Sequence, residues 1–207
     1  MTPRNFGAVA LGCLLSLTGC GNEETDAAEP LTDTGITAIT ISCPTTPAVL
    51  APPATQNLVF KYHAVGVQIY DCKIPTGKVA YEWAFREPRA DLFNAAGELV
   101  GTHFAGPIWQ HSDGSAVTGK KVSEAPGATA NDIPLLKLST TNAAEDTVGK
   151  FSDVTWIQRL TTVGGVAPRT ACSATNSGEV TEVSYTADYY FYRANPGQES
   201  TNLRCGG

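Results

Sequence analysis

The sequence lacks the features of several protein classes. Its basic residues form no cluster beyond the pair Lys120 and Lys121, and its formal net charge is −6, so nucleic acid is excluded as a partner. It has no G-x-G-x-x-G motif after a strand and no alternation of strands with helices, which excludes a Rossmann dehydrogenase. It also has no C-x-x-C element, so a zinc site of cysteine ligands is not expected, and nothing implies a cofactor.

The chain begins with an apolar run that is too short to cross a bilayer, which takes about 20 residues. The run extends from Phe6 to Leu17 and follows the basic residue Arg4, as in a signal peptide. It ends in Leu-Thr-Gly-Cys, with the cysteine at position 20. This ending resembles the lipobox of bacterial lipoproteins, in which small residues let the peptidase approach and the cysteine thiol carries the lipid.

The lipobox resemblance implies cleavage before Cys20 and acylation of its sulfur and its amine. Several acyl chains make a lasting anchor, since a single chain holds only weakly. Gly21 follows the cysteine, where inner-membrane lipoproteins often have Asp, so an outer-membrane destination is favoured. We expect residues 1–19 to be a lipoprotein signal peptide and the exported chain to meet the membrane through its lipid.

Residues 20–56 differ in composition from the rest of the chain, being rich in Pro, Thr, Ala and acidic residues. This composition predicts a flexible tether. Within it, residues 35–42 (GITAITIS) alternate well enough to form a strand or a docking arm, which Cys43 would pin. We therefore divide the exported chain into an acylated tether over 20–56 and a folded domain over 57–207.

Four cysteines remain once the signal peptide is removed and Cys20 is acylated. An even number in an exported chain indicates two disulfide bonds, and four cysteines allow three connectivities. Among these we favour the nested pattern of Cys72–Cys172 with Cys43–Cys205. The second bond would tie the N-terminal arm to the C-terminal tail.

From Leu58 onward, short apolar or aromatic runs recur about every ten residues and are separated by Gly, Pro, Asn and Asp. This pattern is typical of β-strands joined by turns. No stretch of a dozen residues keeps the apolar repeat of an amphipathic helix. We predict a single all-β domain, an antiparallel sandwich or barrel of roughly 8–11 short strands with little helix.

Alternation along a strand predicts which side chains point into the core. In the strand expected near 185–193, the odd-numbered residues share one face, and Asp188, Tyr190 and Tyr192 share the other. Because both faces are aromatic, this strand is either central in the fold or half of a ligand platform, and the central position is favoured.

Two other strands also carry predictions about burial. Tyr81, Trp83 and Phe85 share one face, which we expect to be core. Gln158 shares a face with Trp156, and its amide would need hydrogen-bond partners if that face were buried.

Four stretches of the sequence together resemble one family. They are 66–72 (GVQIYDC), 101–117 (GTHFAGPIWQHSDGSAV), 154–168 (VTWIQRLTTVGGVAP) and 185–194 (YTADYYFYRA). In this order they resemble domain-of-unknown-function family 3455, which is found in bacteria and fungi, often behind signal peptides. The resemblance spans roughly residues 50 to 194. It implies a shared fold and no established activity, so function has to be argued from individual residues.

Residues 102–115 (THFAGPIWQHSDGS) hold the densest set of side chains capable of chemistry. In a hydrolase, His103 or His111 would be the general base, Asp113 would orient it and Ser115 would be the nucleophile. The segment lacks the G-x-S-x-G elbow that exposes a catalytic serine, whereas Asp-Gly between two serines is what a hairpin turn requires. We therefore favour strand ends joined by turns.

Metal and carboxylate chemistry would have to use scattered residues. His63, His103 and His111 are not at ligand spacing, so no metal site is predicted. A glycosidase needs two carboxyl groups at a defined separation, which the sequence does not give. The carboxylates available for such a pair are Glu82, Glu87, Asp91, Asp113 and Asp188.

These observations favour a non-catalytic binding or structural domain on the cell envelope, with cell-wall glycan or another envelope component as its partner. For a glycan, Trp109, Tyr190 and Tyr192 would form a stacking surface. The alternative is a cell-envelope hydrolase that uses a His/Asp or carboxylate pair. The side chains expected to meet a ligand are His103, Trp109, His111, Arg159, Tyr190 and Tyr192.

Overall fold

The computed structural model describes residues 42–143, 148–194 and 203–204. The predicted signal peptide, the acylation site Cys20, most of the predicted tether and Cys205 lie outside the described residues. Among the described residues, no helix is long and apolar enough to span a membrane.

The described part consists of strands and two short 3₁₀ helices. The strands are β1 (Gln56–Lys73), β2 (Glu82–Phe93), β3 (Leu99–Phe104), β4 (Ile108–His111), β5 (Ala116–Ala125), β6 (Leu135–Asn142), β7 (Val154–Gly164), β8 (Val180–Ala194) and β9 (Leu203–Arg204). The 3₁₀ helices are η1 (Ala48–Leu50), before β1, and η2 (Ala174–Asn176), between β7 and β8.

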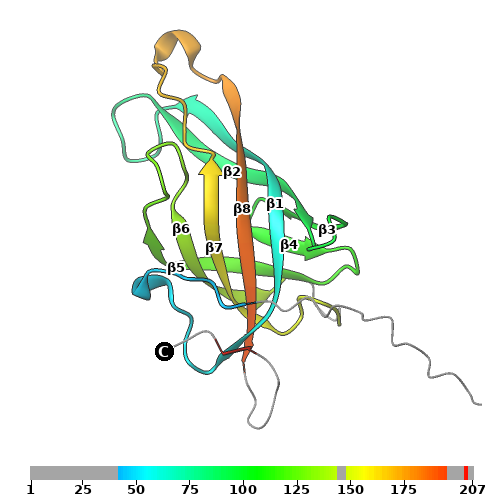
Figure 1. The fold of residues 1–207 in the computed structure, drawn as a ribbon. Coiled ribbons are helices and arrows are strands. Elements are labelled where there is room, and N and C mark those ends of the chain that lie inside the picture. Colours follow the sequence, from blue (N-terminus) through cyan, green and yellow to red (C-terminus); the bar gives the residue numbers. More distant parts are fainter. Residues whose placement is uncertain (1–41, 144–147, 195–202, 205–207) are drawn as a thin grey trace, which may run out of the picture. The chain divides into compact units, whose positions relative to one another are not determined.

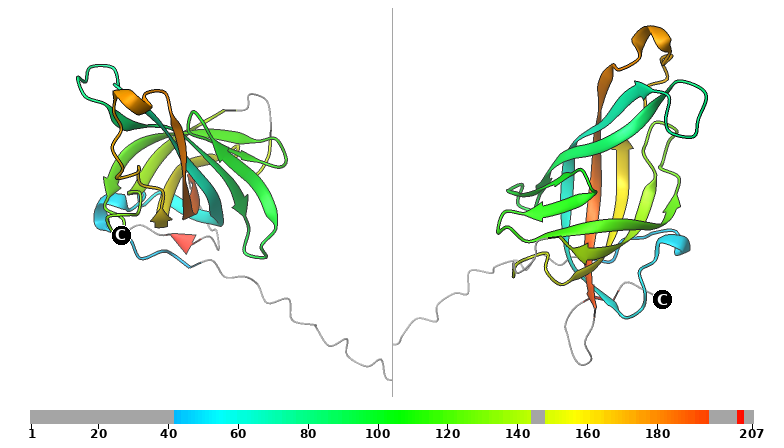
Figure 2. Two further views of the ribbon diagram at one scale, coloured as in Figure 1. Left: turned by 90° about the horizontal axis from the view of Figure 1, so that it is seen from above. Right: turned by 180° about the vertical axis from the view of Figure 1, so that it is seen from behind.

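The strands form a closed barrel (Figures 1 and 2). Each strand from β1 to β8 pairs antiparallel with the next, and β8 returns to pair with β1, while β9 adds a short pairing to β1. The predicted all-β fold is confirmed, and of the two architectures considered the barrel is the one adopted. Closure gives β1 and β8 a neighbour on each side, which removes the exposed edges that an open sheet would have.

The core of the barrel is largely aromatic. The odd-numbered residues of β8 from 185 to 191 point inside and are at most 2% exposed. Toward one end, the rings of Phe60 and Phe151 lie 4.8 and 4.9 Å from that of Phe191. β8 pairs with β1 on one side and with β7 on the other, and its inward aromatic face forms part of the core, as favoured from the sequence.

A short N-terminal arm, residues 42–55, covers part of the outer face of the barrel. Its Leu50 is fully buried, and the Leu50 carbonyl accepts a hydrogen bond of 2.6 Å from Gln158 Nε2. The Tyr192 hydroxyl donates to Gln158 Oε1 at 2.5 Å. The buried amide of Gln158 thus has the partners that it needs. Residues 42–55, part of the predicted tether, therefore pack against the domain.

The aromatic face of β2 differs from its prediction. Phe85 is 53% exposed, and Tyr81 and Trp83 are only half-buried, so the prediction that these residues form core is wrong. The reason is topological, because residues 82–89 of β2 pair with β1 and not with β3. Phe85 lies beside an opening in the barrel wall, where it contacts the ring of Tyr70 at 5.7 Å. Tyr81 and Trp83 lie against residues 167–172, where Trp83 Nε1 donates to the Thr170 carbonyl at 3.0 Å.

Cys72 and Cys172 form a disulfide bond, as predicted. The bond joins the end of β1 to the connection between β7 and β8, just before η2. Backbone hydrogen bonds between Cys72 and residues 178 and 179 hold the same connection. Cys43 is also disulfide-bonded, and its predicted partner, Cys205, lies outside the described residues.

Candidate functional site

Residues 102–115 form strands and turns, as favoured from the sequence. The segment contains the second half of β3, a short turn, β4 and the turn that leads into β5. In the second turn Gly114 has a φ of +90°, a conformation that costs glycine little and other residues more. The same turn brings together the side chains of His111, Asp113 and Ser115, which are the residues that the hydrolase alternative would use.

The arrangement of these three side chains differs from that of a catalytic triad. The Ser115 hydroxyl donates to Asp113 Oδ1 at 2.6 Å and accepts from the Phe151 N–H at 2.9 Å, so its proton is not directed to His111. Ser115 is also fully buried. A nucleophilic serine has to be exposed and bonded to its base. Ser115 instead links its turn to the backbone at Phe151.

Asp113 strengthens the same link. Its Oδ2 accepts from the Lys150 N–H at 2.7 Å and lies 3.1 Å from His111 Nδ1. Desolvation acts to raise the pKa of Asp113, but hydrogen bonds from Ser115 and Lys150 together hold this pKa well below its usual range. The ionised carboxylate is therefore the stable form, and its role is to join the 112–115 turn to the segment before β7.

The histidines are dispersed in the fold. His63 pairs with Asp188 on the outer face of the barrel, at 2.9 Å, while His103 points inside and His111 lies at the turn. Within the described ranges, no three His, Cys, Asp or Glu residues gather so that they could hold a metal ion.

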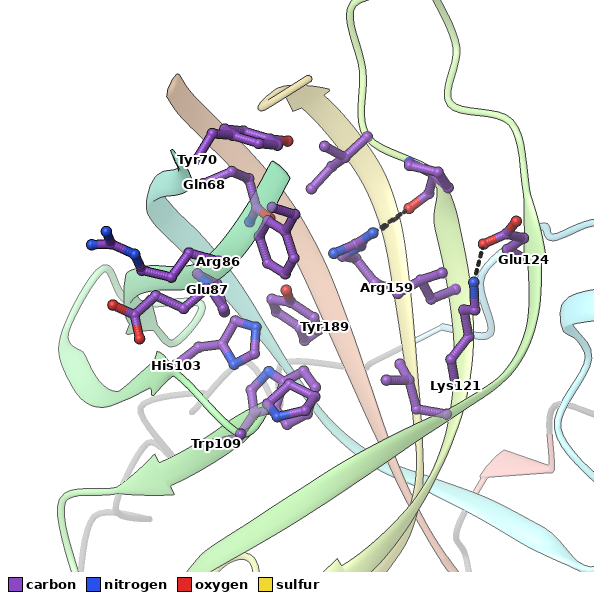
Figure 3. A pocket seen from close by; sticks show the side chains of 18 residues that line it. Gln68, Tyr70, Arg86, Glu87, His103, Trp109, Lys121, Glu124, Arg159 and Tyr189 are labelled. Carbon is purple, nitrogen blue, oxygen red and sulfur yellow. Dashed lines mark hydrogen bonds and ion pairs between the residues drawn. The ribbon is translucent and has the colours of Figure 1, made fainter. Parts of the chain in front are cut away.

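A cavity of about 340 Å³ lies inside the barrel and opens through its wall. Its size is within the range of small-molecule sites, about 300–1,000 Å³. Figure 3 shows the side chains that line it. The inner wall is formed by Gln68, Tyr70, His103, Trp109, Ile133, Leu136, Leu138, Arg159 and Tyr189, and the mouth by Phe85, Arg86, Glu87, Lys121 and Glu124.

The opening follows from the lengths of the strands. The β3–β4 hairpin is short, so β2 pairs with β3 only from Ala90 onward, and β5 pairs with β4 only as far as Thr118. Residues 82–89 of β2 and 119–125 of β5 therefore have a neighbouring strand on one side only in the described structure. The Gly106–Pro107 turn lines the cavity between these two edges.

One wall of the cavity is an aromatic stack. The rings of His103 and Trp109 are nearly parallel, 10° apart, with centroids at 4.1 Å, and Tyr189 meets both edge-on at 5.3 Å. Gly119 makes room for this stack, because a Cβ at that position would lie 2.6 Å from the Trp109 ring. The indole is thus fixed against the barrel wall.

Buried polar groups lie in and behind the cavity wall. Trp109 Nε1, Gln68 Nε2 and the hydroxyls of Tyr185 and Tyr189 make no hydrogen bond of good geometry among the described residues, although the Tyr185 hydroxyl interacts with Gln68 and Tyr189, and the Tyr189 hydroxyl with Arg159. Of these residues, Gln68, Trp109, Arg159 and Tyr189 line the cavity. Burial raises the pKa values of both tyrosines, so their hydroxyls stay protonated. A buried polar group without a partner is unfavourable by roughly 1–3 kcal/mol. A ligand that bonded to the donors of Gln68, Trp109 or Tyr189, which line the cavity, would recover that energy.

Arg159 brings a positive charge to the cavity. Its Nε and Nη2 donate to the Pro134 carbonyl at 3.1 and 2.8 Å, which fixes the guanidinium group (Figure 3). Arg159 takes part in none of the ion pairs found among the described residues. Its charge is therefore not balanced by a carboxylate in contact.

His103 is a neutral hydrogen-bond acceptor in this cavity. Its Nδ1 lies 2.9 Å from the Ile108 carbonyl, and because a carbonyl can only accept, Nδ1 carries the proton and Nε2 has the free lone pair. Burial lowers the pKa of His103 to about 3, although the bond to Ile108 acts in the opposite direction. The ring is therefore neutral at physiological pH.

The structure brings together three of the predicted ligand-binding residues, His103, Trp109 and Arg159. It separates the other three, because His111 lies at the turn, Tyr190 lines a different opening beside Lys61, and Tyr192 is buried under the arm. Trp109 is also buried, at 1% exposed, so the predicted glycan-stacking surface of Trp109, Tyr190 and Tyr192 does not form. Their strands present them to different sides of the barrel wall.

The carboxylates considered for a glycosidase are also dispersed. Only Glu87 among them lines the cavity, while Asp113 is held at its turn, Asp188 pairs with Lys61 and His63, and Glu82 pairs with Lys78. The sequence did not single out Gln68 and Tyr189, which line the cavity. The signal for Tyr189 was its polar hydroxyl on a face predicted to be buried.

Comparisons with known proteins agree with the extent of the domain. The model of one family, described as a protein of unknown function (DUF3455), matches residues 53–193. No curated protein and no solved structure matches the chain.

Proposed function

We propose that this chain, which belongs to the DUF3455 family, is an envelope lipoprotein that binds a small, mostly apolar organic molecule. The family is described as one of unknown function, so the role of the chain is argued from its barrel. The observation that carries this proposal is the cavity in the barrel wall, with its buried donors and aromatic stack. Apolar cavities with a few convergent polar groups are the usual form of small-molecule sites, and eight-stranded barrels are wide enough to hold one small ligand.

The expected affinity is modest. A drug-sized ligand gains about 0.3 kcal/mol per non-hydrogen atom. A ligand of about 20 such atoms would therefore gain about 6 kcal/mol, which corresponds to a dissociation constant of tens of micromolar. A polymeric glycan would meet only the mouth of the cavity, so the proposed ligand is a small molecule and not a cell-wall chain.

Binding can be followed through Trp109. In a Trp83→Phe/Trp156→Phe variant, Trp109 is the remaining tryptophan, and it lines the cavity. We expect the neutral dye N-phenyl-1-naphthylamine to bind with a dissociation constant on the order of 100 μM or tighter, with energy transfer from Trp109 to the dye.

Two substitutions test whether the dye enters the cavity. Leu136 lines it, so Leu136→Phe should fill part of the space and weaken binding at least tenfold. Val65 is 46% exposed on β1, and Val65→Phe places the same phenyl ring away from the cavity and should leave binding unchanged. Absence of dye binding, or equal loss in both variants, would contradict the proposal.

The anchor is proposed on the lipobox resemblance of the residues up to Cys20. Acylation at Cys20 would hold the barrel at the membrane of the envelope, with the outer membrane favoured by Gly21. In an expressing bacterium, the wild-type chain is expected in the membrane fraction, with a mass that includes acyl chains on Cys20. Cys20→Ala should remove both the membrane association and the added mass. An unmodified Cys20 in the wild type would refute the lipid anchor, while ligand binding in the cavity is tested separately by the dye experiment.

A further inference from the structure

The chemistry of the cavity restricts the ligand that it would hold, on the basis of the function proposed above. The buried polar groups that line the cavity and make no bond of good geometry are hydrogen-bond donors: Trp109 Nε1 and Gln68 Nε2 can only donate, and the hydroxyl of Tyr189 is protonated. Arg159 adds donors and a positive charge. A complementary ligand must therefore bring acceptors.

Acidic side chains lie only at the mouth. Glu124 pairs with Lys121 at 2.7 Å, and Arg86 pairs with Asp71, so these charges are largely compensated where they stand. Glu87 also lines the mouth and forms none of the ion pairs found in the described part. Figure 3 shows its carboxylate directed away from Arg159, on the solvent side, where water and salt screen it. The inner wall thus carries one net positive charge.

One side of the cavity is aromatic. His103 and Trp109 stack in parallel, Tyr189 meets them edge-on, and Tyr70 continues this side toward Phe85 at the mouth. Leu136, Leu138 and Ile133 also line the cavity. A flat ring can pack against the aromatic side chains and these branched aliphatic ones, with the offset or edge-on contacts that aromatic groups prefer.

From these contacts we propose that the ligand is an aromatic carboxylate, with its carboxylate at Arg159 and its ring against the His103–Trp109 stack. The guanidinium group is held in place by the Pro134 carbonyl, so it meets the ligand without first losing side-chain freedom. Tyr189 lies close enough to Arg159 for the positive charge to act on its hydroxyl. The hydroxyl and the guanidinium group can therefore share one carboxylate.

The proposal can be tested with two probes of similar shape that differ in charge. Calorimetric titration should show 2-naphthoate binding about 10- to 100-fold more tightly than neutral 2-naphthalenemethanol, the range expected for hydrogen bonds to a charged group. Arg159→Met should abolish this preference by weakening 2-naphthoate and leaving 2-naphthalenemethanol nearly unchanged. Arg159→Lys keeps the charge and should retain part of the preference, which guards against misfolding as the cause of a loss.

A matched control is available at the mouth. Arg86→Met removes the same charge from another residue that lines the cavity, and it should change 2-naphthoate binding less than about threefold, since this charge is exposed and already paired. Equal affinity of the two probes for the wild type, or an equal loss in the Arg86 and Arg159 variants, would overturn the ligand class. If neither naphthalene probe nor the neutral dye binds, the proposed function itself fails.

Discussion

Replacing Cys72 and Cys172 together by alanine is expected to lower the free energy of unfolding by about 4 to 5 kcal/mol. The disulfide closes a loop of 100 residues, and in the chain-entropy model a loop of this length contributes about 4.7 kcal/mol by restricting the unfolded chain. Small domains are stabilised by about 5–15 kcal/mol in total. The variant should therefore lie close to the limit of folding.

Urea denaturation followed by circular dichroism measures this loss. Cys72 is fully buried, so part of the effect of alanine comes from lost packing. A Cys72→Ser/Cys172→Ser variant keeps side chains of nearly the same size and serves as the control. Similar losses in the two variants would assign the effect to the bond. If both variants lost less than about 1.5 kcal/mol of unfolding free energy, the disulfide would not be the main constraint that stabilises the β7–β8 connection.

Acidification from pH 6.5 to pH 5 is expected to lower the stability by about 2 kcal/mol through His103 alone. Its pKa is about 3 in the folded protein, against 6.5 for an ordinary histidine. Between these two values the unfolded chain binds a proton that the folded chain does not, so the free energy of unfolding falls as pH falls. The contribution is complete above pH 6.5 and is lost progressively down to pH 3, on the order of 4 kcal/mol in all.

The variant His103→Gln isolates this effect. Glutamine is uncharged, so the variant should have a flatter stability profile between pH 6.5 and 5, although its stability at pH 7 is lower because the stack with Trp109 is lost. His63 and His111 remain in both proteins, and carboxylates titrate mainly below this window, so the difference between the two profiles belongs to position 103. Parallel profiles would show that the buried imidazole does not titrate as described.

The sequence predicted correctly those features that depend on residues close together in the chain. The Asp-Gly turn at 113–114 and the buried odd-numbered face of β8 follow from turn chemistry and alternation, and both are present. Closure of the barrel depends on the pairing of β1 with β8, which joins residues more than a hundred positions apart. No local pattern contains that information, so sandwich and barrel could not be separated.

The site was predictable only in part, for the same reason. His103, Trp109 and Arg159 were named for their chemistry, but their meeting depends on which strands are neighbours. Tyr192 was named for the same kind of chemistry, but it is buried under the N-terminal arm. Its hydroxyl donates to Gln158, which in turn donates to the Leu50 carbonyl of the arm. Phe85 was expected in the core because its strand alternates, yet the short β3–β4 hairpin leaves that part of β2 beside the opening.

The opening between β2 and β5 has a consequence for self-association. Two strand segments, 82–89 and 120–125, have no neighbouring strand on the side of the opening, so another sheet could pair with them, a recurrent route to aggregation. Both segments carry the residues that discourage such pairing: Pro88 interrupts one, and the other contains Lys120 and Lys121 followed by a bulge between Lys121 and Ser123. A barrel with an opening in its side can in this way keep the two strands that border the opening from pairing with strands of other molecules.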